Sequence, residues 1–178
     1  MIDETHPPRR ILRSVGAVLA GFFATFILSI ATDVVLHAIG VFPAWGQPMS
    51  NALFALATAY RTIYTVAGGY ITARLAPDRP MAHVWALAII GLIAALAGTM
   101  ATWSAGPEFG PKWYPLALVA LALPSVWAGG KLARRATART SFYRKRMRAK
   151  EPLKHYVIPR SAPFNRAIVF SSVPPPRL

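Results

Sequence analysis

Four long apolar stretches, separated by short segments rich in proline and glycine, dominate the pattern of hydrophobic and polar positions along the chain. A helix that crosses the core of a bilayer needs about 20 predominantly apolar residues, and each stretch meets that length. We therefore expect helices over residues 14–41, 51–75, 82–104 and 112–132. Because the connections between them are short, consecutive helices should pack as antiparallel neighbours. The pattern predicts an all-α integral membrane protein, folded as a four-helix bundle.

The polar segments at the two ends divide the chain into three parts. Residues 1–13 form a basic N-terminus, residues 14–135 the transmembrane domain, and residues 136–178 a basic, proline-containing tail. Prolines recur after Glu151. Because proline interrupts helices, we expect this tail to be largely disordered.

Composition and charge support a membrane location and indicate an orientation. Charged residues make up only 15% of the chain, against roughly 25% in soluble domains. Lys and Arg outnumber Asp and Glu by 20 to 6, and most of them lie before the first helix, between the second and third, and after the fourth. By the positive-inside rule both termini of this multi-pass protein should be cytoplasmic. The low share of charged residues excludes an ordinary soluble enzyme, and the lack of Cys excludes a secreted disulfide scaffold.

An alternative interpretation concerns the first apolar stretch. Arg9 and Arg10, the apolar run over 15–28 and the small residues that follow it resemble a cleaved signal peptide. The apolar stretch continues to Phe42, however, which makes it longer than the core of a signal peptide. A retained membrane-spanning helix is therefore the favoured interpretation.

Three ionisable residues lie inside the predicted spans, away from the ends where basic residues gather: Asp33, His37 and Arg61. Such groups are costly in hydrocarbon and mark either function or buried pairs. At 1.5 Å per residue, Asp33 lies about 12 Å from the end of the first helix and Arg61 about 15 Å from the start of the second. We expect an ion pair between them, with Tyr60 or Tyr64 nearby. His37, one turn after the acid, should join the pair as a hydrogen-bond partner.

The polar cluster allows two interpretations. It is either a buried pair that holds the first hairpin together, or a proton or anion site lined by the same groups. A salt-bridged carboxylate resists protonation, and the predicted spans hold no second acid to receive a proton, so the structural interpretation is favoured. The sequence contains no Cys, no HExxH, no phosphate-binding glycine loop and no GxSxG. We expect no catalytic residues, no cofactor and no metal site.

Small residues recur on single faces of the predicted helices, where they let helix backbones approach closely. We expect these faces to pack inside the bundle or against another chain; the residues are Gly68, Gly69, Gly91, Ala95, Gly98 and Gly129.

Two parts of the sequence also resemble each other. Ala-Gly-Gly occurs at 67–69 and again at 128–130, and an aromatic-proline segment precedes both helices. A tandem duplication of one helical hairpin would explain this similarity, and so would chance recurrence of common membrane-helix features.

A cluster of basic residues follows the fourth helix. Each positive charge near an anionic membrane surface contributes about 1 kcal/mol, so we expect lipid headgroups to be bound by Arg144, Lys145, Arg146, Arg148 and Lys150. A nucleic-acid partner is less favoured, because the sequence around these residues predicts no RNA-binding fold.

Residues 42–135 resemble small four-helix bacterial inner-membrane proteins that have no assigned function. The similarity is carried by residues 60–65, 68–70, 72–77, Pro115 and 127–130. It implies a helical bundle in the inner membrane and transfers no catalytic residues.

Two classes of function follow from the sequence. The favoured one is a non-catalytic membrane protein that packs against itself or a larger membrane complex. The alternative is a small dimeric transporter or channel, in which Asp33, His37 and Arg61 line an ion or proton site.

Overall fold

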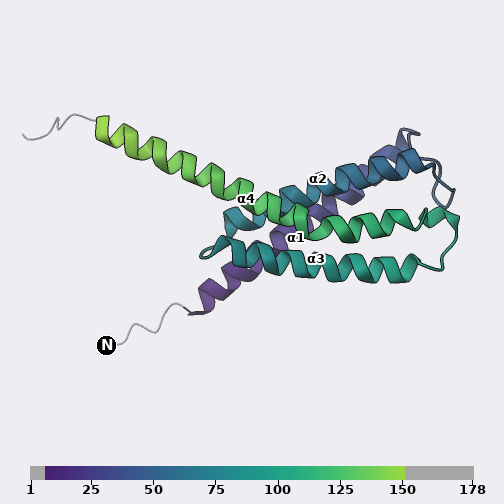
Figure 1. Ribbon diagram of the computed structural model, residues 1–178, viewed down its shortest axis with the longest axis horizontal. Coiled ribbons are helices and arrows are strands. Elements are labelled where there is room, and N and C mark those ends of the chain that lie inside the picture. Colours follow the sequence, from purple (N-terminus) through teal and green to yellow (C-terminus); the bar gives the residue numbers. More distant parts are fainter. Residues whose placement is uncertain (1–6, 151–178) are drawn as a thin grey trace, which may run out of the picture. The chain divides into compact units, whose positions relative to one another are not determined.

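The computed structural model describes residues 7–150, and within them every regular element is a helix. The elements are α1 (Pro7–Ala38), α2 (Asn51–Leu75), α3 (Pro80–Thr102), the short 3-10 helix η1 (Pro107–Phe109) and α4 (Trp113–Lys150). The α1–α2 and α3–α4 connections lie at one end of the bundle, here called the distal end (Figure 1). The α2–α3 connection lies at the opposite, proximal end. The prediction of an all-α fold with four long helices is confirmed.

Local sequence explains where α1 ends and where α2 and α3 begin. The Ser50 hydroxyl accepts a hydrogen bond from the Leu53 amide and caps α2, which has the bounds expected from its apolar pattern. Helix α3 starts at Pro80 rather than at 82, since proline is well suited to a first helical position. Helix α1 ends at Ala38 rather than at 41, just before Gly40, whose φ of 75° favours glycine.

The fourth helix was expected to end at 132 and the disordered tail to begin at 136. Both expectations are wrong for the residues up to 150. Helix α4 continues to Lys150, because Ala, Arg and Lys are strong helix formers and no proline follows until Pro152. By its internal contacts the chain divides into two compact units after Ser141. The first unit holds the bundle, including the first part of α4. The disorder expected after Glu151 lies outside the described residues.

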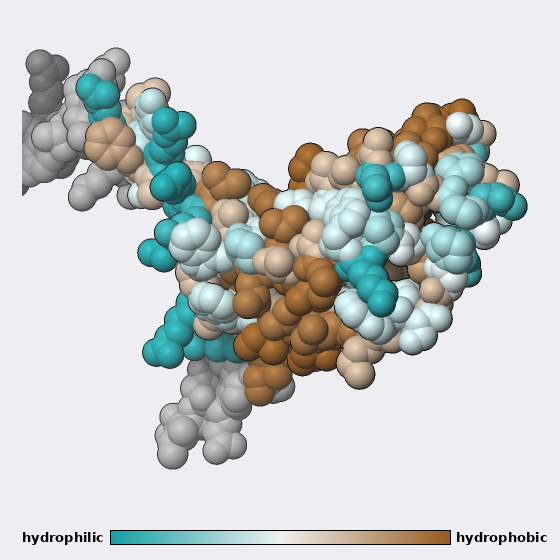
Figure 2. Space-filling model, turned by 45° about the vertical axis from the view of Figure 1, so that its right-hand side comes forward, coloured by the Kyte–Doolittle hydropathy of each residue, from teal (hydrophilic) through white to brown (hydrophobic). Residues whose placement is uncertain are grey.

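Three segments are long and apolar enough to cross a membrane: Arg10–Ala38, Pro80–Thr102 and Pro107–Tyr143. They identify a membrane protein. Helix α2, the remaining predicted span, does not reach the same hydropathy because it carries Arg61 and several hydroxyl side chains. Large apolar side chains point outward from the bundle, among them Ile93 (61% exposed) and Met100 (79%), and hydrophobic surface is visible in Figure 2. Such a surface suits lipid rather than water.

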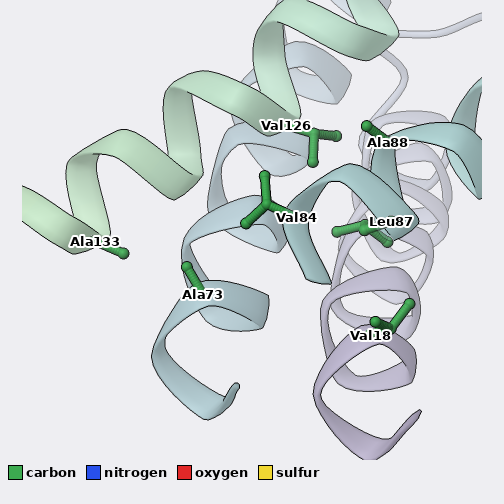
Figure 3. Close-up of a cluster of buried hydrophobic side chains, with 7 residues drawn as sticks. All are labelled: Val18, Ala73, Val84, Leu87, Ala88, Val126 and Ala133. Atoms are coloured by element: carbon green, nitrogen blue, oxygen red, sulfur yellow. The ribbon is translucent and has the colours of Figure 1, made fainter. Parts of the chain in front are cut away.

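All four long helices contribute to one buried apolar cluster toward the proximal end of the bundle (Figure 3). Val84 and Leu87 of α3 pack in this cluster with Val18 of α1 and Val126 of α4. A smaller cluster of Phe42, Ala57 and Tyr60 joins α1, its following connection and α2. The proximal cluster holds α3 and α4 against the α1–α2 hairpin.

Glycines allow two close helix crossings. A Cβ on Gly69 would fall 2.3 Å from the Val126 carbonyl oxygen, and one on Gly129 would fall 2.0 Å from that of Val66, so α2 and α4 cross backbone to backbone. A Cβ on Gly68 would likewise meet α1, 2.2 Å from the Thr25 hydroxyl oxygen. Because the two Ala-Gly-Gly segments meet at the same crossing, packing accounts for that part of their similarity, and the duplication stays a hypothesis.

Candidate functional site

The expected contact between Asp33 of α1 and Arg61 of α2 is present. The Arg61 Nη2 atom lies 2.5 Å from Asp33 Oδ2. The Tyr60 hydroxyl donates a hydrogen bond to the other carboxylate oxygen, Oδ1. Both oxygens of the acid are therefore held by neighbouring residues of one helix. The Asp33 side chain is 17% exposed and that of Arg61 33%.

Further polar contacts between α1 and α2 position this ion pair. The Thr32 and Tyr64 hydroxyl oxygens lie 2.9 Å apart, and the Thr25 hydroxyl donates to the Tyr64 carbonyl at 3.1 Å. Ring centroids of Tyr60 and Tyr64 lie 5.8 Å apart, so the two tyrosines also pack together. Interhelical hydrogen bonds thus fix the register in which Asp33 and Arg61 meet.

His37 was expected to hydrogen-bond the Asp33 carboxylate, but it does not. Its Nδ1 lies 2.8 Å from the Asp33 backbone oxygen, one turn earlier in α1. The ring stacks on Trp45, with centroids 3.7 Å apart, and meets the Phe42 ring edge-on. The connection after α1 folds back over His37 and draws the ring away from the ion pair, and the sequence carries no signal for that return. Tyr60 occupies the place that was expected for the histidine.

A cavity of about 560 Å³ lies beside the ion pair, among α1, α2, α3 and α4. Its wall is mostly apolar, and Arg61 is the one charged residue among those that line it. Neither Asp33 nor His37 contributes to the lining. The sequence-predicted cluster is therefore divided, with only its arginine at the cavity.

Several hydroxyl groups in the cavity wall donate hydrogen bonds to backbone oxygens of their own helices. The hydroxyls of Thr62, Thr65 and Thr99 each donate to the backbone oxygen four residues earlier, at 2.7, 2.8 and 2.8 Å. Ser29 does the same on α1. These side chains therefore offer acceptor lone pairs to the cavity, and Arg61 supplies donors.

The small residues of α3 lie at the cavity rather than at a close helix crossing. Gly91, Ala95 and Gly98 line the cavity, and a Cβ on Gly91 or Gly98 would meet nothing within 4 Å. They form no close helix crossing within the described chain, unlike Gly68, Gly69 and Gly129. Helices α3 and α4 meet nearer the proximal end instead. There the Val84 side chain packs over Gly130 and belongs to the main buried cluster.

The remaining predicted residues lie on α4. Arg144, Lys145, Arg146, Arg148 and Lys150 belong to its last turns, after the division between the two compact units. Within residues 7–150 there is no group of three or more His, Cys, Asp or Glu residues that could hold a metal ion.

No protein-family model, curated protein or solved structure matches the chain.

Proposed function

We propose that the chain is a non-catalytic protein of a bacterial inner membrane that packs against itself or a larger membrane complex. The observation that carries this proposal is the engagement of Asp33 by Arg61 and Tyr60 together. A carboxylate with both oxygens bonded is poorly suited to carry a proton, because protonation would break those contacts. The pair serves to hold α1 and α2 together.

The proposal includes four spans, with α2 as the second, and cytoplasmic termini. Helix α2 has 25 residues, enough to cross a bilayer core. Its arginine is bonded by α1, and its close glycine contacts are made with α1 and α4. Polar residues that face other helices need not meet lipid, which offsets the lower hydropathy of this helix. Residues 1–13 then precede the transmembrane domain, and residues 136–178 follow it in the cytoplasm.

The assembly can be tested on the full chain, purified in mild detergent and weighed by native mass spectrometry. We expect a mass equal to two or more copies, or a fixed ratio to another membrane protein. A mass of one copy, without a protein partner, would contradict the proposal.

The alternative function is a small dimeric transporter or channel, and one observation favours it: Arg61 lines a cavity. Proton or anion flux through vesicles that contain the purified protein distinguishes the two functions. The favoured proposal expects no flux above that of protein-free vesicles. Flux that disappears in Arg61→Leu, in a variant that still folds, would establish the transporter.

Topology provides a direct prediction. Reporter fusions after Arg79 and after Arg139 should report a cytoplasmic location, and fusions near Gln47 and Glu108 a periplasmic one, because basic residues concentrate beside the first pair of positions. A periplasmic signal after Arg139 is incompatible with four spans and a cytoplasmic N-terminus.

The basic residues after the bundle provide another prediction. A peptide of residues 140–154 should bind anionic vesicles and leave them as salt rises, since screening at about 1 M salt shortens the reach of charge to roughly 3 Å. Co-sedimentation with vesicles measures this. Equal binding to vesicles of neutral lipid would show that charge is not responsible.

A further inference from the structure

The cavity beside Arg61 is long. Along α3 it is lined from Leu87 to Thr102, a rise of about 22 Å, and along α4 from Tyr114 to Val126, about 18 Å. Both helices follow its length. Its long axis therefore runs with the helices, in the direction in which lipid chains lie in a bilayer.

The two ends of the cavity differ in packing. At the proximal end Leu87 and Val126 belong to the main buried cluster and close it. Toward the distal end the lining includes Phe109, Tyr114 and the half-buried Thr102, none of which belongs to that cluster. A ligand that enters from the distal side would end against apolar residues. This order suits a molecule with an apolar chain and a more polar group nearer the distal end.

Arg61 determines what that polar group should be. A guanidinium has five N–H donors, and the one acceptor that the described residues give it is the Asp33 carboxylate, through Nη2. Its Nε is buried without an acceptor, and a third of the side chain remains exposed. The nearby threonine hydroxyls donate to helix carbonyls, so Arg61 is the charged donor that a ligand would meet in this cavity. The ligand should therefore carry an acceptor oxygen.

The charge of that acceptor follows from the ion pair. Asp33 already balances the positive charge of Arg61 at a distance of 2.5 Å. An anionic ligand at the arginine would be repelled by Asp33, whereas a neutral oxygen would not. In a bilayer, the abundant neutral acceptor attached to a long apolar chain is the ester carbonyl of a glycerolipid.

We propose that this cavity binds one acyl chain of a glycerolipid, with its ester carbonyl accepting a hydrogen bond from Arg61. The volume of about 560 Å³ lies within the range of small-molecule sites. The proposal goes beyond the assembly role above and requires only that the helices lie in a membrane.

Binding of three probes to the full chain in detergent tests the ligand class. The probes are a monoacylglycerol, the fatty acid of the same chain length and a prenylated benzoquinone, each titrated and followed by native mass spectrometry. We expect the monoacylglycerol to bind most tightly. Tighter binding of the fatty acid, or of the quinone, overturns the assignment, and so does the absence of binding.

Variants locate the site. Gly91→Leu and Gly98→Leu place a side chain in the cavity, where a Cβ meets nothing, and should weaken monoacylglycerol binding by about tenfold or more without loss of folding. Gly16→Leu is the matched control, because a Cβ there also meets nothing and the residue lies outside this cavity. Unchanged binding in both cavity variants, or an equal loss in the control, overturns the proposal.

A further variant tests the role of charge. Asp33→Asn keeps an acceptor for Arg61 but leaves its positive charge unbalanced. The preference should then reverse, with the fatty acid binding more tightly than the monoacylglycerol. An unchanged preference in folded Asp33→Asn would show that the ion pair does not select a neutral ligand. If this variant does not fold, the probe series and the glycine variants still decide the proposal.

Discussion

Replacing Asp33 with leucine should lower the free energy of unfolding by about 3–5 kcal/mol, the typical cost of leaving one member of a buried ion pair alone. Arg61→Leu should be similarly costly, because Asp33 would then keep only the hydrogen bond from Tyr60. The double variant should be more stable than either single variant, since no unbalanced charge remains. Thermal unfolding of the four proteins in detergent measures the coupling.

One outcome of this double-mutant cycle would count against the ion pair. Strictly additive effects would contradict the contact, because residues that do not interact show no coupling energy. Tyr60→Phe serves as a smaller comparison within the same site. It removes a single hydrogen bond to a charged group, worth about 1.5–3 kcal/mol, and leaves the ion pair intact.

Adding one methyl group at the α2–α4 crossing should destabilise the bundle strongly. In Gly129→Ala the new Cβ would fall 2.0 Å from the Val66 carbonyl oxygen and 2.8 Å from the Tyr70 nitrogen, both backbone atoms. A side chain could rotate away, but here a whole helix must move. We expect a loss of about 3 kcal/mol, the upper part of the range for overpacking.

The same substitution at Gly98 should have the opposite sign. No atom lies within 4 Å of a Cβ there, and alanine favours a helix over glycine by up to about 1 kcal/mol. Gly98→Ala should therefore match or exceed the stability of the wild type in thermal unfolding. Equal destabilisation by both substitutions would show that the close crossing is not specific to Gly129.

The sequence was sufficient to predict the helical fold and the meeting of Asp33 with Arg61. Hydropathy marks apolar stretches, and a short connection makes the first two helices antiparallel, so the rise per residue brings the two charges to one level. The orientation of His37 could not be predicted in this way, because it depends on the return of Trp45 over the ring.

The cavity could not be predicted either. The small residues of α3 have the same spacing as those of a packing face, and only the position of α4 decides whether they meet a helix or an empty space. Helix α4 itself extends past its predicted end because an apolar pattern marks where a membrane span stops, and helix propensity continues beyond it.

The bonding of Asp33 to Arg61 has a consequence for how the protein enters the membrane. Helix α1 is synthesised first, and a lone aspartate within a span is costly to insert, by up to about 2.5–3.5 kcal/mol where it lies at the centre of the span. Helix α2 carries a comparable cost in its arginine. Neither helix can neutralise its own charged side chain. Once the two helices meet, the ion pair between Asp33 and Arg61 lowers the insertion cost of both. We therefore expect α1 and α2 to leave the translocation machinery together, as a preassembled hairpin, rather than one after the other.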